Sequence, residues 1–288
     1  MRLHPVLTGT LLRVSGALFF VFLICRTFAA GRAEEIVTIQ PPRPAPLRVV
    51  IKADDLTDER GGVAPGWRRF EGFVVERRMK VGIGIITRSL EGEKPVYFDW
   101  IKHLHGTGLV EFWNHGYDHK RWTGDDGVRR WEFSGTDEPH QKAHLATGQT
   151  LARSKLGIIF RTFGAPFNET DGTTLRLLAA DPDLKVWLYG DTAKAPPNVF
   201  AARRPAGLPM EPTALKPDFS AFVTAFERRR GGDTDRPYLV LQGHPAHWDA
   251  EGFAGFVRIV DYLTEKGAVF VTPLELAEAM TGMDATKE

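Results

Sequence analysis

Short apolar runs rich in β-branched residues alternate with amphipathic stretches from Arg48 to near the end of the chain. The runs lie at 48–53, 81–87, 109–115, 158–164, 185–190, 238–243 and 268–272. Apolar residues recur at helical spacing around 64–79, 96–105, 138–156, 172–180, 217–230, 251–266 and 273–281. Strands that alternate with helices of this length are typical of βαβ units, so the pattern predicts an α/β fold with a parallel sheet.

The number of these units favours a closed sheet over an open one. Seven strand–helix units in about 235 residues fit a single-domain α/β barrel, because barrels of this kind need about 250 residues. The stretch 198–205 is a candidate for an eighth, irregular strand. A doubly wound open sheet stays possible, since periodicity alone does not show whether a sheet closes.

The first 33 residues have the order of charges and apolar residues found in secretory signals. Arg2, His4 and Arg13 come first, the apolar run 14–25 follows, and small residues close the segment in TFAAGRA. A transmembrane helix needs about 20 apolar residues, more than this run has. We therefore expect residues 1–33 to be a signal peptide of a secreted or periplasmic protein, with a membrane anchor as the alternative.

Composition and charge narrow the range of partners. Cleavage after residue 33 would remove Cys25, the only cysteine, together with four arginines, which takes the net charge from +1 to −3. Without a basic excess we expect no nucleic-acid binding, and membrane contact only through the N-terminal segment. The proline-rich stretch 34–47 predicts a linker, 48–282 the barrel and 283–288 a polar tail.

Polar residues gather where the predicted strands end, which is where α/β barrels carry their functional groups. The first strand ends in Asp54-Asp55, and the third ends in NHGYDH, with His115 and His119. A late strand ends in QGHPAHW, where His244 could serve as a general acid. Because neighbours in a strand point to opposite sides, we expect the two aspartates to take different roles, one at a metal and one as a base.

Two histidine pairs share a spacing of four residues but differ in their surroundings. His115 and His119 follow a strand, and on a helical turn they could hold one metal ion with the help of a carboxylate. His140 and His144 begin a polar-faced helix that no strand precedes. We expect this second pair to be solvated and to bind no metal.

In this order, the motifs resemble those of the polysaccharide deacetylase family of carbohydrate esterases. That family has a distorted (β/α) barrel of about seven strands, an Asp-Asp pair, an H-x3-H motif, a proline-containing loop and a late Leu-x-His. The matches here are IKADD, HGYDH, GAPFN with Pro166, and LQGHP, within residues 48–275. The resemblance implies a divergent member of the family with the same single-domain fold.

The resemblance also implies a chemistry. Asp55, His115 and His119 would bind a divalent metal, with zinc first and cobalt, nickel or manganese as alternatives. Asp54 would be the base that takes a proton from metal-activated water, and His244 the acid that protonates the leaving amine. The implied enzyme hydrolyses carbon–nitrogen bonds and removes N-acetyl groups from an acetylated glycan.

Three positions depart from the family pattern. Gly164 stands where the family has an arginine that pairs with the base, Gly116 where it has Ser or Thr, and Ala53 where it has an aromatic residue. Loss of the arginine leaves room for an alternative, a catalytically weakened carbohydrate-binding protein on the same fold. A hydrolase of a small amide or ester is a third possibility.

We expect Lys52 to take over the role of the absent arginine. Side chains repeat every two residues along a strand, so Lys52 shares a face with Asp54 at roughly 6.5 Å between their Cα atoms. Arg161 is the other candidate for this role. Further candidates for substrate contact or support lie near the motifs: Glu132, Pro166, Asn168, Asp171 and Trp248.

Overall fold

Seven parallel strands form a nearly closed barrel in a computed structural model that describes residues 46–213, 215–229 and 237–282. The expected signal peptide, most of the expected linker and the polar tail lie outside the described residues. The strands are ordered β9-β1-β2-β3-β6-β7-β8. Their bounds are β1 (Arg48–Leu56), β2 (Val81–Ile85), β3 (Val110–Asn114), β6 (Thr162–Phe163), β7 (Val186–Leu188), β8 (Phe200–Ala202) and β9 (Tyr238–Gly243).

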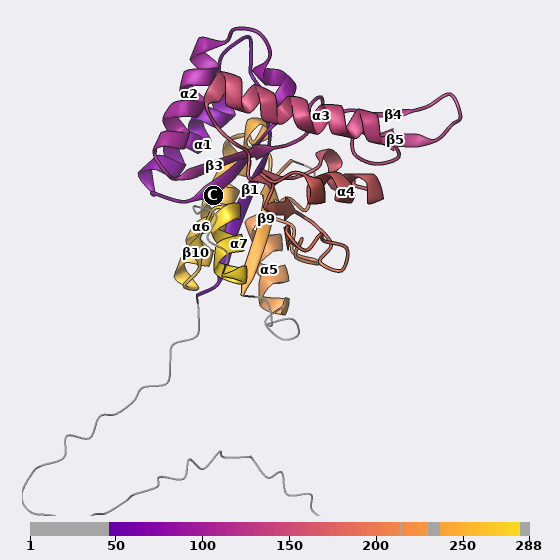
Figure 1. Ribbon diagram of the computed structural model, residues 1–288. Helices are drawn as coiled ribbons and strands as arrows, with labels where there is room; N and C mark the ends of the chain where they lie inside the picture. Colours follow the sequence, from indigo (N-terminus) through magenta and orange to yellow (C-terminus); the bar gives the residue numbers. More distant parts are fainter. Residues whose placement is uncertain (1–45, 214, 230–236, 283–288) are drawn as a thin grey trace, which may run out of the picture. The chain divides into compact units, whose positions relative to one another are not determined.

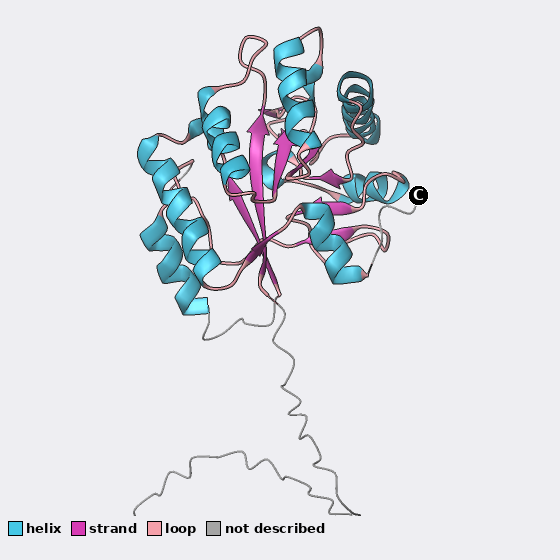
Figure 2. Ribbon diagram, turned by 90° about the vertical axis from the view of Figure 1, so that its left-hand side faces the viewer, coloured by secondary structure: helices cyan, strands magenta, loops and turns pink. Residues whose placement is uncertain are grey.

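Helices surround the strands, which Figure 2 shows gathered at the centre. They are α1 (Pro65–Glu76), α2 (Pro95–Gly106), α3 (Glu138–Leu151), α4 (Gly172–Ala180), α5 (Phe219–Arg229), α6 (Ala250–Glu265) and α7 (Pro273–Thr281). None of these described helices is both long and apolar enough to cross a membrane. The distorted barrel predicted from the alternation of strands and helices is confirmed, and the chain does not form the open doubly wound sheet.

Three strands or strand pairs differ from what the sequence predicted. The expected last strand, β10 (Val269–Phe270), pairs only with the first two residues of β1 and takes no place in the barrel wall. The irregular stretch 198–205 instead contains β8, which completes the wall. An unexpected hairpin of β4 (Arg121–Thr123) and β5 (Arg129–Trp131) projects from the barrel beside α3 (Figure 1). The two hairpin strands have three residues each and no apolar run, so the sequence pattern does not indicate them.

A tyrosine bridges the wall between β8 and β9, which share no backbone pairing in the described chain. The hydroxyl of Tyr189 donates to the carbonyl of Val240 at 3.2 Å and accepts from the N–H of Gln242 at 3.1 Å. Burial raises the pKa of Tyr189 above its ordinary value, so the hydroxyl keeps its proton and remains a donor. The bridge fixes the end of β9, where Gln242 enters the site.

The indole of Trp113 fills the barrel interior beneath the mouth, the end at which the strands finish. Trp113 is fully buried. A Cβ at Gly84 or at Gly164 would lie 2.3 or 2.7 Å from an atom of its ring, which is closer than van der Waals contact allows. The ring therefore occupies the space next to Gly164, and an arginine at that position would have to displace it.

Candidate metal centre and catalytic residues

The end of β1 delivers two carboxylates to one site. Its pairing with β2 shifts register between Ala53 and Leu56, and Asp55 has a φ of 69°, a strained conformation that is kept mainly at functional sites. The shift breaks the alternation of side chains, so the expectation that the two aspartates point to opposite sides is wrong. His115 Nε2 lies 3.0 Å from Asp55 Oδ1 and 3.8 Å from Asp54 Oδ2.

Asp55, His115 and His119 bring three ligand atoms within 4.8 Å of one another. Asp55 Oδ1 lies 3.0 Å from His115 Nε2 and 3.2 Å from His119 Nε2. His115 Nδ1 donates to the carbonyl of Gly164 at 2.7 Å, which orients the ring and leaves Nε2 as its ligand atom. Two imidazoles and a carboxylate in this arrangement fit a divalent metal ion, with positions left for water and substrate.

The electrostatics of this triad favour a cation. Burial alone would raise the pKa of Asp55, but its hydrogen bonds with His115 and His119 hold that pKa well below its usual range. Burial would likewise lower the pKa of His119, yet the partnership with Asp55 raises it. The aspartate is therefore ionised, and the negative charge around His119 favours a cation there.

The loop that carries His119 is not the helical turn that the spacing suggested. Gly116 and His119 have left-handed φ values of 74° and 53°. The fully buried carboxylate of Glu132 accepts the backbone N–H groups of Tyr117 and of His119, the latter at 2.8 Å. A Cβ at Gly116 would lie 2.7 Å from Glu132 Oε2, so glycine here makes room for the carboxylate that holds the loop.

His140 and His144 lie on α3 but are not solvated, so that expectation is wrong. Their ring centroids are 4.1 Å apart, and His144 Nδ1 lies 2.9 Å from Glu132 Oε1. Asp118, Glu132 and His144 form a second group of ligand-type side chains in the described residues. Because Glu132 already accepts two backbone N–H groups, we interpret this group as a support for the His119 loop.

The two oxygens of Asp54 have different surroundings. Oδ2 accepts hydrogen bonds from Lys52 Nζ and, at 2.7 Å, from Gln242 Nε2. Oδ1 is buried and has no hydrogen-bond partner among the described residues. Asn168 Nδ2 donates in turn to Gln242 Oε1 at 3.3 Å. One oxygen is thus held by donors, while the other is free to accept a proton.

Lys52 lies between two aromatic rings beneath Asp54. It is fully buried, and its Nζ is 5.1 Å from the ring centroids of both Trp113 and Tyr189. Burial lowers the pKa of Lys52, and the neighbouring Asp54 opposes this shift. Arg161, the other candidate, pairs with Asp183 at 3.3 Å instead.

Glu211 holds the proposed acid, and sequence reasoning missed it. Its carboxylate lies 2.6 Å from His244 Nδ1 and accepts the N–H of His244 at 2.8 Å and the indole N–H of Trp248 at 2.6 Å. His244 Nε2 lies 3.8 Å from Asp55 Oδ2, so it faces the triad. Burial alone would lower the pKa of His244, but Glu211 and the two aspartates raise it. No pattern marks Glu211, which lies in an irregular segment 33 residues before His244.

The remaining candidate residues either lie at the site or stabilise the structure around it. Pro166 begins a short 3-10 helix to Asn168, and the Phe167 ring lies 4.3 Å from that of His119. Trp248 is 4% exposed, so its indole donates to Glu211 and offers no open face to a sugar.

Asp171 is the N-cap of α4 and accepts the N–H of Thr173 at 2.9 Å, so its role is structural. Gln242 was also missed; it stands where the late motif has its leucine.

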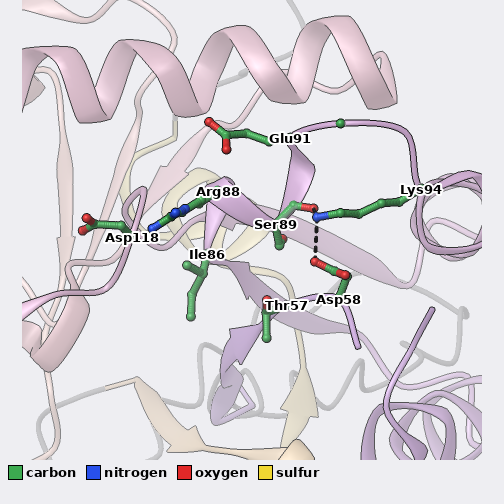
Figure 3. A pocket seen from close by; sticks show the side chains of 9 residues that line it. Thr57, Asp58, Ile86, Arg88, Ser89, Glu91, Lys94 and Asp118 are labelled. Carbon is green, nitrogen blue, oxygen red and sulfur yellow. Dashed lines mark hydrogen bonds and ion pairs between the residues drawn. The ribbon is translucent and has the colours of Figure 1, made fainter. Parts of the chain in front are cut away.

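Two cavities flank the triad. The larger, about 660 Å³, lies beside the ends of β1 and β2 and is lined by Thr57, Asp58, Ile86, Arg88, Ser89, Glu91, Gly92, Lys94 and Asp118. Figure 3 shows Arg88 and Asp118 on one side of it and the Lys94–Asp58 ion pair on the other. The smaller, about 190 Å³, adjoins β9 and is lined by Tyr189, Arg204, Pro209, Met210, Glu211, Leu215, Gln242 and His244.

Solved structures match this chain, although no family model and no curated protein sequence does. A family 4 acetyl xylan esterase from Clostridium thermocellum, in complex with a cobalt ion, superposes with a TM-score of 0.56 and 15% identity over 83% of this chain and 93% of that one. A Mycobacterium smegmatis protein assigned as a polysaccharide deacetylase gives 0.60 and 16%, over 84% and 93%. A family 4 carbohydrate esterase pseudoenzyme from Bacillus anthracis gives 0.52 and 12%, over 82% and 66%.

These similarities define the fold class. The chain is a (β/α) barrel like those of the family 4 carbohydrate esterases, and the resemblance drawn from its motifs is confirmed at the level of the fold. An esterase and a pseudoenzyme share this fold, so it does not by itself establish an activity. The activity has to be argued from the residues at the mouth of the barrel.

Proposed function

We propose that this protein is a divergent, metal-dependent polysaccharide deacetylase that removes N-acetyl groups from a glycan. The observation that carries the proposal is the placement of a metal-type triad between two separately supported proton-transfer groups. His115 Nε2 lies 3.8 Å from Asp54, and His244 Nε2 lies 3.8 Å from Asp55. A base and an acid on either side of a metal site are what hydrolysis of an amide requires.

Asp55, His115 and His119 would hold the metal ion. A divalent cation supplies Lewis-acid chemistry, because it polarises an acyl carbonyl and makes a water molecule more acidic. The cobalt ion of the Clostridium esterase supports a divalent metal on this fold. We expect zinc at the triad, with cobalt, nickel or manganese as alternatives.

Asp54 is the proposed base. Its Oδ1 is the atom that would accept the proton of the attacking water, since it is buried and without a partner in the described part of the chain. Lys52 and Gln242 donate hydrogen bonds to Oδ2, which fixes the plane of the carboxylate. This pair of donors does what the family's arginine would do.

His244 is the proposed acid. The Glu211 carboxylate holds Nδ1 and directs Nε2 toward the triad. The raised pKa of His244 favours the imidazolium, which is the form that can donate a proton. It would give its Nε2 proton to the nitrogen of the departing amine, so that the carbon–nitrogen bond breaks to yield acetate and a free amino sugar.

A catalytically weakened carbohydrate-binding protein is the second candidate. The glycine at position 164 and the pseudoenzyme with the same fold favour it. The ion pair between Lys52 and Asp54 weighs against it, because a buried charged pair with no task is costly to keep. Hydrolysis of a small amide or ester is a further alternative, which the choice of substrates in the test addresses.

Acetate release and metal content test the proposal together. The metal-loaded protein is screened over neutral and acidic N-acetylated glycans and over small N-acetyl amides. His115→Ala/His119→Ala should lose both the metal and acetate release, whereas His140→Ala/His144→Ala should keep one ion per chain. Full retention of metal in the first variant would overturn the site. The mass of protein recovered outside the cytoplasm tests the proposed secreted or periplasmic location, which requires loss of residues 1–33.

A further inference from the structure

Arg204 lines the smaller cavity beside the proposed acid. The residue lies two positions after the end of β8, and the cavity is also lined by Gln242 and His244. Gln242 hydrogen-bonds to Asp54, and His244 faces Asp55. A group bound in this cavity would therefore lie next to the residues that transfer protons.

Arg204 is an exposed residue whose guanidinium lies over an aromatic ring and has no acceptor among the described residues. Its Cζ lies 5.3 Å from the ring centroid of Tyr189, a cation–π contact that orients the side chain. In the described ranges it takes part in no hydrogen bond and no ion pair, so its five N–H donors remain available. The one carboxylate in the cavity, Glu211, is already bound by His244 and Trp248.

The larger cavity has a small excess of carboxylates. Its lysine, Lys94, pairs with Asp58 at 2.7 Å, and its other charged residues are Arg88, Glu91 and Asp118. It therefore favours an anion less than the smaller cavity does. The smaller cavity instead places Arg204 near the buried cation Lys52, which it disfavours electrostatically, and an anion would relieve this repulsion.

We propose that the substrate carries a carboxylate, and that Arg204 binds this group in the cavity beside His244. This inference rests on the proposed function, because it assigns a substrate class to the same site. A planar guanidinium matches a carboxylate with two parallel hydrogen bonds. The carboxylate could belong to the sugar, as in a uronic acid, or to the acyl group. The near-neutral charge of the chain disfavours a long polyanion as substrate.

Calorimetric binding to the metal-loaded full chain is the test. Three probes of equal length are compared: a neutral N-acetylated oligosaccharide, one with a uronate beside the N-acetyl sugar, and one in which an N-succinyl group replaces the N-acetyl group and supplies the only carboxylate. The wild type should bind one carboxylated probe about 10- to 100-fold more tightly than the neutral probe, the range expected for a charge-assisted hydrogen bond. Which probe is preferred identifies the source of the carboxylate.

Arg204→Gln should abolish this preference and leave affinity for the neutral probe unchanged. Arg258→Gln is the matched control, because Arg258 also lies over an aromatic ring, 4.0 Å from the Phe219 centroid, but on α6 outside the cavity. Equal wild-type affinity for all three probes, or a preference that survives in Arg204→Gln, overturns the inference. Acetate release is measured separately, so preferential binding without release would refute the deacetylase and leave the carboxylate site standing.

Discussion

Lys52 and Gln242 occupy one oxygen of Asp54 and leave the other for chemistry, and this asymmetry can be tested at Lys52. Lys52→Met removes the cation that pairs with Asp54. We expect kcat to fall by about 100-fold, at the lower end of what acid–base catalysis contributes. The acidic limb of the pH–rate profile should move to higher pH, while metal content stays unchanged.

A second lysine provides the control for this variant. Lys80 also pairs with a carboxylate, that of Glu275, but it is 40% exposed and remote from Asp54 in the sheet. Lys80→Met should leave both the turnover and the pH profile as they are in the wild type. Normal turnover and an unshifted acidic limb in Lys52→Met would rule out its proposed role.

Glu211 should set the position of the alkaline limb of the pH–rate profile. Its hydrogen bond and its charge raise the pKa of His244, so the imidazolium acid persists to higher pH in the wild type. In Glu211→Gln the ring loses its proton at lower pH, and we expect the alkaline limb of kcat/KM to move downward. An alkaline limb that does not move in pH–rate measurements of this variant would remove His244 as the acid.

At the scale of elements, one carboxylate connects helix α3 to the loop that carries a metal ligand. Glu132 accepts the N–H of His119 at 2.8 Å and lies 2.9 Å from His144 Nδ1. Glu132→Gln replaces one acceptor oxygen with an NH₂ group that cannot accept. We expect metal affinity to fall about 10- to 100-fold, as for other residues that orient metal ligands.

Chelator competition measures this loss, and thermal unfolding of the metal-free protein shows whether the variant folds. Glu138→Gln is the matched control, because Glu138 also belongs to α3 but pairs with Arg176 on the surface. Wild-type metal affinity in a folded Glu132→Gln protein would contradict the role given to the loop.

At the scale of the whole molecule, the Trp113 indole limits the size of the side chains that fit in the barrel interior. Gly164→Ala would set a Cβ 2.7 Å from the Trp113 ring. We expect this change to lower the free energy of unfolding by about 1–3 kcal/mol, as overpacking of a core does. In a Trp113→Leu background the same change should cost less, because the ring is gone.

Denaturant unfolding of the four proteins in this cycle measures the coupling between the two positions. Gly72→Ala is the control, since Gly72 lies in α1 with nothing within 4 Å of its Cβ position, and there alanine should stabilise the helix. Equal costs for Gly164→Ala in both backgrounds would show that Trp113 does not exclude side chains from that position.

Local periodicity was enough to predict much of this protein. The alternation of strands and helices predicted the barrel, because each element is specified by residues close in sequence. The period of two along β1 put Lys52 and Asp54 on one face, and they form an ion pair. The strand-end positions of Asp55, His115 and His119 predicted that they would meet, since parallel strands finish at the same end of a barrel.

The contacts between residues far apart in the sequence depend on the closure of the barrel and could not be predicted. Gln242 reaches Asp54 across 188 residues, and Glu211 reaches His244 from an irregular segment, so neither contact follows from a period or a motif. The bulge that turns Asp55 toward His115 depends on the register with β2, which alternation alone does not contain. Sequence patterns thus determined most of the elements and the shared face of Lys52 and Asp54, whereas the packing of distant elements determined the partners that hold each catalytic group.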